Sequence, residues 1–239
     1  MIRTLATLLI ALVAATTAAG KEDVPAVRFD PVVKDMEGWT VHVEPALLEG
    51  EHAADGARAL RMLGDHLNRI ALLMNPEQLE KLRTCEIWIE RQHPTLGNMQ
   101  YHPGLGWLER NGHDPRLVKK VHIPRAAALL ERGQLLKHPA VVLHELAHAY
   151  HDQILGFEEP GINKIWKQAM DEKLYDRVLL FNGRLVKHYA TTNPKEYFAE
   201  STEAYFYRND FYPFVRAELM NHDPRMHAVM EDVWGNLGG

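Results

Sequence analysis

Apolar residues recur at helical spacing along much of this 239-residue chain. In residues 55–74 they fall at three- and four-residue steps, the pattern of a helix that buries one face. Alternating apolar and polar residues indicate short strands elsewhere. The patterns predict further helices at 76–83, 140–155, 162–178, 193–208, 213–220 and 224–234, and strands at 40–43, 84–91, 98–102 and 117–123. We therefore expect an α+β fold, mostly helical, with a small sheet between helices.

Turn and cap residues refine the second half of the chain. Asn182-Gly183 between two short apolar runs is the signature of a tight β-hairpin in residues 179–186. Asn193 followed by Pro194 fits the cap and first position of the next helix. The hairpin is thus expected to direct the residues that lead into this helix.

The first twenty residues differ from the rest of the chain. Arg3 precedes a weakly apolar run at residues 5–15, and small residues follow before the charged Lys21. This order predicts a signal peptide at 1–20, cleaved near Ala19 or Gly20, and a secreted or periplasmic protein. A retained anchor is the alternative, but the run is shorter than the roughly 20 apolar residues of a membrane span. Residues 21–239 contain no linker or repeat and are expected to form a single domain.

Composition excludes several classes of partner. Hydrophobic residues make up 46% of the chain, which suffices for a packed core. A net charge of -5 without a long run of Lys or Arg indicates neither a nucleic-acid partner nor an anionic membrane. Cys85, the only cysteine, has no partner for an intramolecular disulfide and is expected to pack as a small apolar residue. The sequence does not define an oligomeric state.

The segment His144-Glu145-Leu146-Ala147-His148 is an HExxH motif in the middle of an apolar helical segment. Because residues four apart share a helix face, the two imidazoles can bind one zinc ion while Glu145 reaches the water on the metal. Peptide hydrolysis is the reaction that this motif suggests. The alternative is a pair of hydrogen-bonded structural histidines on an ordinary buried helix.

A catalytic zinc site needs a third protein ligand, and two segments offer one. His151 follows His148 by three residues and can share its face, as a ligand or as a histidine at the rim. Glu196, Glu200 and Glu203 fall on one face of a helix rich in aromatic residues, where buried like charges repel and a cation would relieve the conflict. Glu196 could instead complete a capping box with Asn193.

The order of these motifs resembles a known family. HExxH, then Tyr189, then seven residues later the helix motif Glu196-Tyr197-Phe198-Ala199-Glu200 is similar to the zinc-peptidase domain of anthrax lethal factor and its relatives, a gluzincin group. The match covers roughly residues 117–206. The resemblance implies a zincin-like fold in which an HExxH helix carries the active site. It also implies these roles: zinc ligands His144, His148 and Glu196; general base Glu145; oxyanion donor Tyr189; and Glu200 as the carboxylate behind a zinc histidine.

The sequence therefore predicts a secreted zinc metalloendopeptidase whose partner is a peptide or protein substrate. The substrate is expected to lie extended along an edge strand, for which residues 98–102 are the candidate. Two alternatives stay open: a binding or scaffold protein that keeps a zincin fold without turnover, and a zinc hydrolase of a non-peptide bond. Tyr189 could also be an ordinary tyrosine at the end of a strand.

Overall fold

The first half of the chain folds around a mixed sheet of five strands. The structure, a computed structural model, describes residues 26–237. The strands lie in the order β1-β2-β3-β5-β4, with β1 and β4 at the two edges. The β1/β2 and β5/β4 pairs are antiparallel and the two central pairs are parallel. The bounds are β1 Val32–Met36, β2 Trp39–Val43, β3 Ile87–Ile89, β4 Gln100–Tyr101 and β5 Val121–Ile123.

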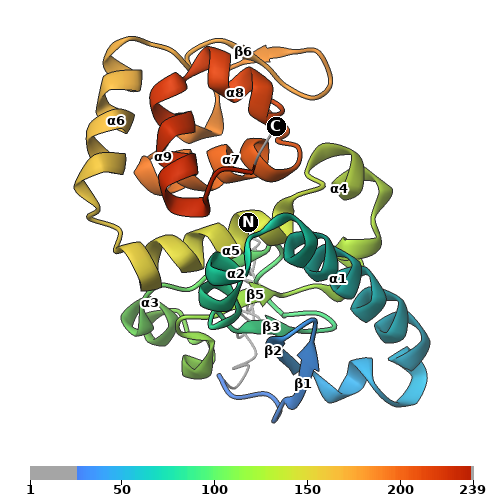
Figure 1. Cartoon of the computed structure of the whole chain (residues 1–239). Coiled ribbons are helices and arrows are strands. Elements are labelled where there is room, and N and C mark those ends of the chain that lie inside the picture. Colours follow the sequence, from blue (N-terminus) through green and yellow to red (C-terminus); the bar gives the residue numbers. More distant parts are fainter. Residues whose placement is uncertain (1–25, 238–239) are drawn as a thin grey trace, which may run out of the picture.

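Helices cover both faces of this sheet (Figure 1). The long helix α1 (Ala53–Leu73) buries Leu63 and Leu67 in the same core as Ile87 and Ile89 of β3. Each such fully buried side chain contributes roughly 1.5–3 kcal/mol. Because side chains alternate along a strand, Trp88 points to the other face, where it packs in a separate cluster with Leu108 and Leu117. The smaller helices here are α2 (Pro76–Arg83), α3 (Leu105–Arg110) and α4 (Arg132–Lys137).

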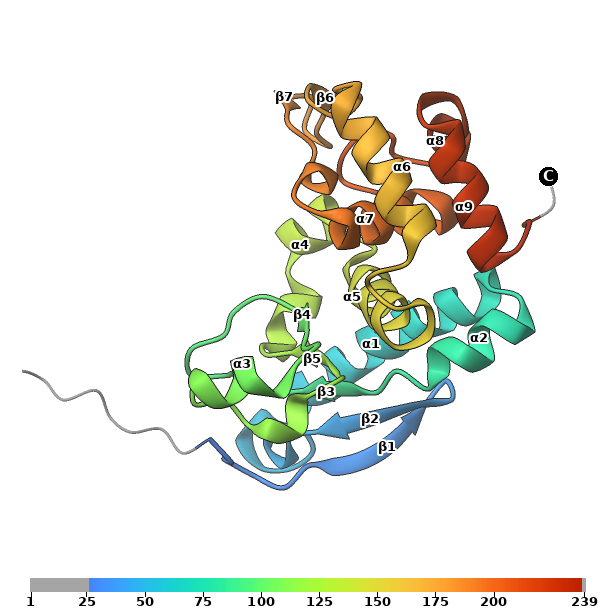
Figure 2. The ribbon, with the colours of Figure 1, turned by 90° about the vertical axis from the view of Figure 1, so that its left-hand side faces the viewer.

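The second half is helical and is joined to the sheet by α5 (Val141–Tyr150). Figures 1 and 2 both show α5 between the sheet and the group of C-terminal helices. Residues of α5 belong to one core cluster with residues of α1 and α7, so a single core runs through both halves. The C-terminal elements are α6 (Pro160–Asp171), β6 (Val178–Leu179), β7 (Leu185–Val186), α7 (Pro194–Phe206), α8 (Arg216–His222) and α9 (Pro224–Trp234).

The structure confirms the α+β class, with mostly helical residues and a small sheet. The hairpin forms as β6 and β7, with Gly183 at φ +84°, a conformation that glycine adopts without strain. Asn193 caps α7, since its side chain accepts hydrogen bonds from the backbone N–H groups of Lys195 and Glu196. Cys85 is buried and free, as expected.

Several predicted boundaries were wrong because local backbone geometry overrides the hydrophobic pattern. The strand at 117–123 begins only at Val121, since residues 115–117 form a 3-10 turn and Lys119 takes a positive φ of 59°. The helix at 162–178 ends at Asp171, just before Lys173 at φ +58°. Similarly, the strand at 84–91 shortens to β3, and the helix at 213–220 shifts to α8.

One strand and two α-helices within residues 26–237 were not predicted. β1 has four exposed residues out of five and therefore no alternating pattern, and it is defined by its pairing with β2. The short helices α3 and α4 carry too few buried residues to show periodicity.

The helix predicted at 140–155 changes after Tyr150 into a single π-helical turn, His151–Leu155, which stops at Gly156 with φ +83°.

No helix within residues 26–237 is long and apolar enough to cross a membrane. The predicted signal peptide at 1–20 lies outside the described residues.

Candidate metal centre

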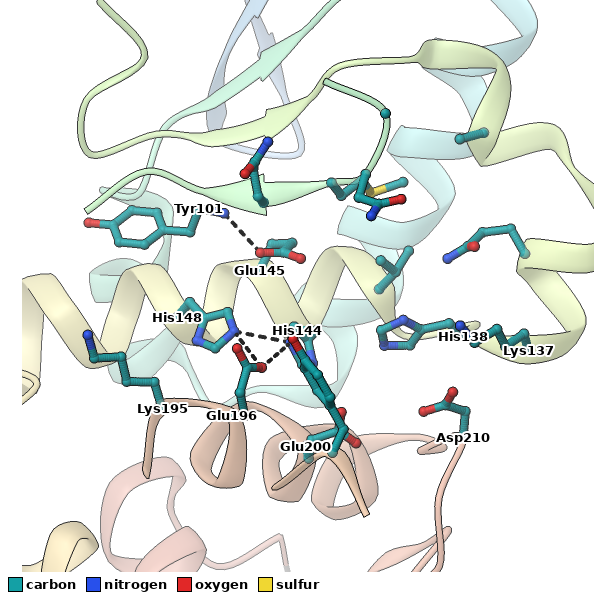
Figure 3. Close-up of a pocket in the computed structure, with 18 of the residues that line it drawn as sticks. Tyr101, Lys137, His138, His144, Glu145, His148, Lys195, Glu196, Glu200 and Asp210 are labelled. Carbon is teal, nitrogen blue, oxygen red and sulfur yellow. Dashed lines mark hydrogen bonds and ion pairs between the residues drawn. The ribbon is translucent and has the colours of Figure 1, made fainter. Parts of the chain in front are cut away.

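Helices α5 and α7 pack against each other and supply the HExxH histidines and Glu196 from facing sides. Figure 3 shows His144 and His148 pointing from α5 toward Glu196, which rises from the first turn of α7. The cap by Asn193 fixes where α7 begins, and so fixes the position of Glu196 opposite the histidines. The structure thus brings Glu196 to His148 and His144, which precede it in the sequence by 196 − 148 = 48 and 196 − 144 = 52 residues.

The three donor atoms form a compact triangle. Oε2 of Glu196 lies 3.2 Å from Nε2 of His144 and 3.2 Å from Nε2 of His148, and the two Nε2 atoms are 3.1 Å apart. Ligands at 2.0–2.1 Å from a tetrahedral zinc stand about 3.3–3.4 Å apart, so these separations suit one small ion. This His/Glu group is close enough to hold a metal ion.

The chemistry of the three atoms also calls for a cation. Oε2 of Glu196 is buried and accepts no hydrogen bond from residues 26–237, although both Nε2 atoms are near it. The carboxylate of Glu203 can only accept, so Nδ1 of His144 carries the proton in their 2.6 Å hydrogen bond. If the ring is neutral, Nε2 of His144 carries no proton, and its lone pair faces the negatively charged Glu196 oxygen, which repels it. A metal ion or an additional proton removes this repulsion.

The pKa of His144 reflects the same surroundings. Burial alone lowers this pKa, but the carboxylates of Glu196 and Glu203 outweigh burial and raise the pKa well above its usual value. For Glu196 the directions are opposite. Burial alone raises its pKa, but His144 and His148 outweigh burial and hold the Glu196 pKa far below its usual value. The site therefore keeps an ionised carboxylate against two imidazoles, the donor set that zinc prefers.

A second group of possible ligands, His138, His144 and Glu203, shares the His144 ring. Its distances are those of hydrogen bonds: Oε1 of Glu203 lies 2.6 Å from Nδ1 of His144 and 2.8 Å from Nε2 of His138. Two ligands of one zinc ion would not approach to 2.6 Å. This group is therefore a set of hydrogen bonds around Glu203, on the side of the His144 ring away from Glu196, and not a second candidate metal site.

In the structure Glu203 is the carboxylate that accepts the hydrogen bond from Nδ1 of His144, the place that the resemblance implied for Glu200. Both lie on α7, and it is Glu203, three residues further along the helix than the motif suggested, that reaches Nδ1 of His144. Glu200 is buried in the cavity wall with Oε2 unpaired among residues 26–237. Burial, followed by the charge of Glu203, raises the pKa of Glu200 well above its usual range, because both disfavour the ionised carboxylate. The only sequence signal for Glu203 was its place on the acidic face.

Glu145 turns to the other wall of the same cavity. Its Oε2 accepts a 2.9 Å hydrogen bond from the backbone N–H of Tyr101 in the edge strand β4, as Figure 3 shows. The phenol of Tyr101 in turn donates to Asp152, 2.6 Å away, just beyond α5. This second contact ties β4 to the α5 segment and so holds the carboxylate of Glu145 in place.

Tyr189 lies at the rim of the cavity in a 3-10 turn, Tyr189–Thr191, directly after the β6–β7 hairpin. The turn is held by His188, whose Nδ1 accepts a hydrogen bond from the N–H of Ala190. Tyr189 is 48% exposed, and its hydroxyl makes no hydrogen bond with a residue of the described range 26–237. The negative charge of Glu196, followed by burial, raises the pKa of Tyr189, so its hydroxyl stays protonated at neutral pH.

His151 lies outside the triad. It is fully buried, its ring packs near Phe157 and Phe198 at 5.2 and 4.8 Å between centroids, and neither ring nitrogen has a hydrogen-bond partner among residues 26–237. The sequence allowed His151 as the third ligand, but the structure brings Glu196, and not His151, to the two histidines of the HExxH motif. The Glu196 carboxylate faces the histidines, so the capping-box role does not account for it.

The triad, Glu145 and Tyr189 line one open cavity of about 490 Å³. Residues 97–101, which include the edge strand β4, form one wall, and the start of α7 forms the opposite wall. Lys137 and His138 lie at one end of this cavity and Lys195 at the other (Figure 3).

Comparison with known proteins adds no relative: no family model, no curated protein and no solved structure matches this chain.

Proposed function

We propose that this protein is a zinc-dependent metallopeptidase with a zincin-like active site. The observation that carries the proposal is the triangle of donor atoms from His144, His148 and Glu196, which lie 3.1–3.2 Å apart. Glu145 of the same HExxH motif lies beside this triangle in the cavity. Zinc held by these three side chains would supply a Lewis acid that polarises a carbonyl and lowers the pKa of water to about 7.

Glu145 is the general base in this proposal. Its carboxylate lines the cavity next to the triad, and the Tyr101 N–H occupies only one of its oxygens. The carboxylate can take a proton from the attacking water and then return it to the leaving amine. The hydrogen bond from β4 keeps the side chain oriented between these two steps.

Tyr189 is the proposed donor to the oxyanion. Its hydroxyl is protonated, has no protein hydrogen bond to break among the described residues, and lies on the rim of the cavity that contains Glu196. A single such donor contributes roughly 10²- to 10³-fold to the rate. The partly exposed side chain is free to approach when a substrate fills the cavity.

The edge strand β4 supports a peptide as the substrate. β5 pairs with one side of β4, and the other side faces the cavity, where the N–H of Tyr101 already points toward Glu145. An extended peptide can add to such an edge through main-chain hydrogen bonds, which would lay its backbone across the metal triad. Main-chain recognition of this kind fits a protease that accepts a range of side chains.

The test is digestion of a broad peptide library by the purified protein, with mass spectrometry of the products. We expect cleavage that a zinc chelator abolishes and added zinc restores. Glu145→Gln should keep the zinc and the melting temperature but lose nearly all cleavage, and Glu109→Gln on the exposed surface of α3 is the matched control. A zinc-loaded wild type that cuts no peptide would refute the peptidase and favour a scaffold or a hydrolase of another bond.

A further inference from the structure

His138 is a third histidine at the metal centre, and neither the HExxH motif nor the acidic helix accounts for it. It lies in the short connection between α4 and α5, where its backbone N–H donates to Gln134 and its carbonyl accepts from Val141. Its side chain is 17% exposed at one end of the cavity. The His138 and His144 rings meet edge to face, with centroids 5.3 Å apart.

His138 and His144 bond the same oxygen. Oε1 of Glu203 accepts from Nδ1 of His144 at 2.6 Å and from Nε2 of His138 at 2.8 Å. The Glu203 side chain is completely buried, and its other oxygen has no hydrogen-bond partner among residues 26–237. The two histidines are therefore the only side chains in the described part of the chain that hold this carboxylate in place.

We infer that His138 is a positioning residue for the metal centre: its Nε2–H holds the Glu203 carboxylate against Nδ1 of His144, which leaves Nε2 of His144 directed at the metal position. The inference rests on the metal site of the proposed function. A carboxylate behind a metal-bound histidine fixes the tautomer and orientation of the ring. Here that carboxylate could rotate about its side chain if only His144 held it, and His138 supplies the second anchor from a different segment.

The chain offers variants that separate the hydrogen bond from the space that the ring fills. His138→Leu removes the donor and keeps a side chain of similar volume. His138→Gln keeps an amide N–H close to the position of Nε2. Lys137→Met is the matched control, because Lys137 lines the same end of the cavity and makes no hydrogen bond or ion pair with Glu203.

The first measurement is zinc affinity by competition with a chromophoric chelator. Loss of a direct outer partner typically weakens metal binding 10- to 100-fold. Because His138 acts through Glu203, we expect His138→Leu to weaken binding about 10-fold, His138→Gln to stay within about 3-fold of wild type, and Lys137→Met to leave affinity unchanged. Equal losses in the Leu and Gln variants, or no loss in either, would overturn the positioning role.

The second measurement needs no metal. In the metal-free protein, ¹⁵N-resolved NMR follows exchange with water of the Nδ1-bound proton of His144, which the fixed Glu203 carboxylate protects. His138→Leu should speed this exchange at least several-fold and His138→Gln should restore the protection; an unchanged rate in both variants counts against the inference. If His138→Leu fails to fold, His138→Asn, whose amide is too short to reach Glu203, replaces it in both measurements. Zinc binding without hydrolysis in the wild type would refute the peptidase and leave this inference standing.

Discussion

Acid should unfold this protein near pH 5, because five histidines are buried in the neutral form. Each of them is at most 6% exposed. Burial is the main cause that lowers the pKa of His66, His93 and His151 to about 4. The same cause lowers the pKa of His102 and His188 to about 3. In His93 and His188 the ring Nδ1 also accepts backbone hydrogen bonds that protonation would break.

The sign and size of the effect follow from proton linkage. An unfolded histidine has a pKa near 6.5, so below that pH the unfolded chain binds more protons than the folded chain. The stability that these histidines contribute is therefore present above pH 6.5 and is lost as the pH falls toward the folded pKa. One histidine with a folded pKa of about 4 costs about 1.9 kcal/mol between pH 7 and pH 5, and five cost about 9 kcal/mol. This matches the roughly 5–15 kcal/mol of a typical domain. His144 opposes the trend, since its folded pKa is raised, but it is one group against five.

The assay is urea unfolding of chelator-treated protein between pH 7 and pH 5, followed by circular dichroism. Chelation removes zinc release as a second source of pH dependence. The free energy of unfolding should fall by about 5–6 kcal/mol per pH unit between pH 6 and pH 5, which corresponds to about four protons taken up on unfolding.

His151 provides the matched test of this reasoning. Its ring packs near Phe157 and Phe198 without a hydrogen-bond partner among residues 26–237, so His151→Phe fills the same space with an apolar ring. The variant should take up about one proton fewer, and the slope should fall by about 1.2 kcal/mol per pH unit. His52→Gln is the control, because the His52 side chain is 39% exposed. A wild-type slope below two protons, or an unchanged slope in His151→Phe, would refute the reasoning.

Three further predictions concern the candidate metal centre. Glu196→Gln should lose most of its zinc in elemental analysis, because the carboxylate charge between the two imidazoles is removed, whereas His151→Ala should keep nearly all of it; the opposite ranking contradicts the triad. Tyr189→Phe should lower kcat roughly 10²- to 10³-fold and change KM little, because the hydroxyl acts when the oxyanion forms; steady-state kinetics in which only KM changes would assign it to ground-state binding. Glu200→Gln should leave zinc affinity within about 3-fold of wild type and should not lower the melting temperature at pH 8, because the raised pKa makes the buried carboxyl costly to ionise. A large loss of zinc affinity would show that Glu200, like Glu203, supports His144.

The sequence alone determined the parts of this protein that depend on local spacing. The periodicity of residues 55–74, the Asn-Gly turn at Asn182 and the Asn-Pro cap at Asn193 each produced the element that they predicted. The four-residue step from His144 to His148 placed both imidazoles on one helix face. Short-range geometry decides each of these features, so a short stretch of sequence contains all of the information.

Tertiary structure decided which side chains meet across elements. Glu203 and His138 reach His144 only because α7 and the α4–α5 connection pack against α5, and no spacing rule encodes that register. Glu200 and Glu203 stand only about 60° apart around the helix and about 4.5 Å apart along it, so a small change in how α7 packs decides which of them reaches His144. The sequence could therefore identify an acidic face on this helix, while the packing of the buried aromatic residues of α7 decided which carboxylate of that face reached His144.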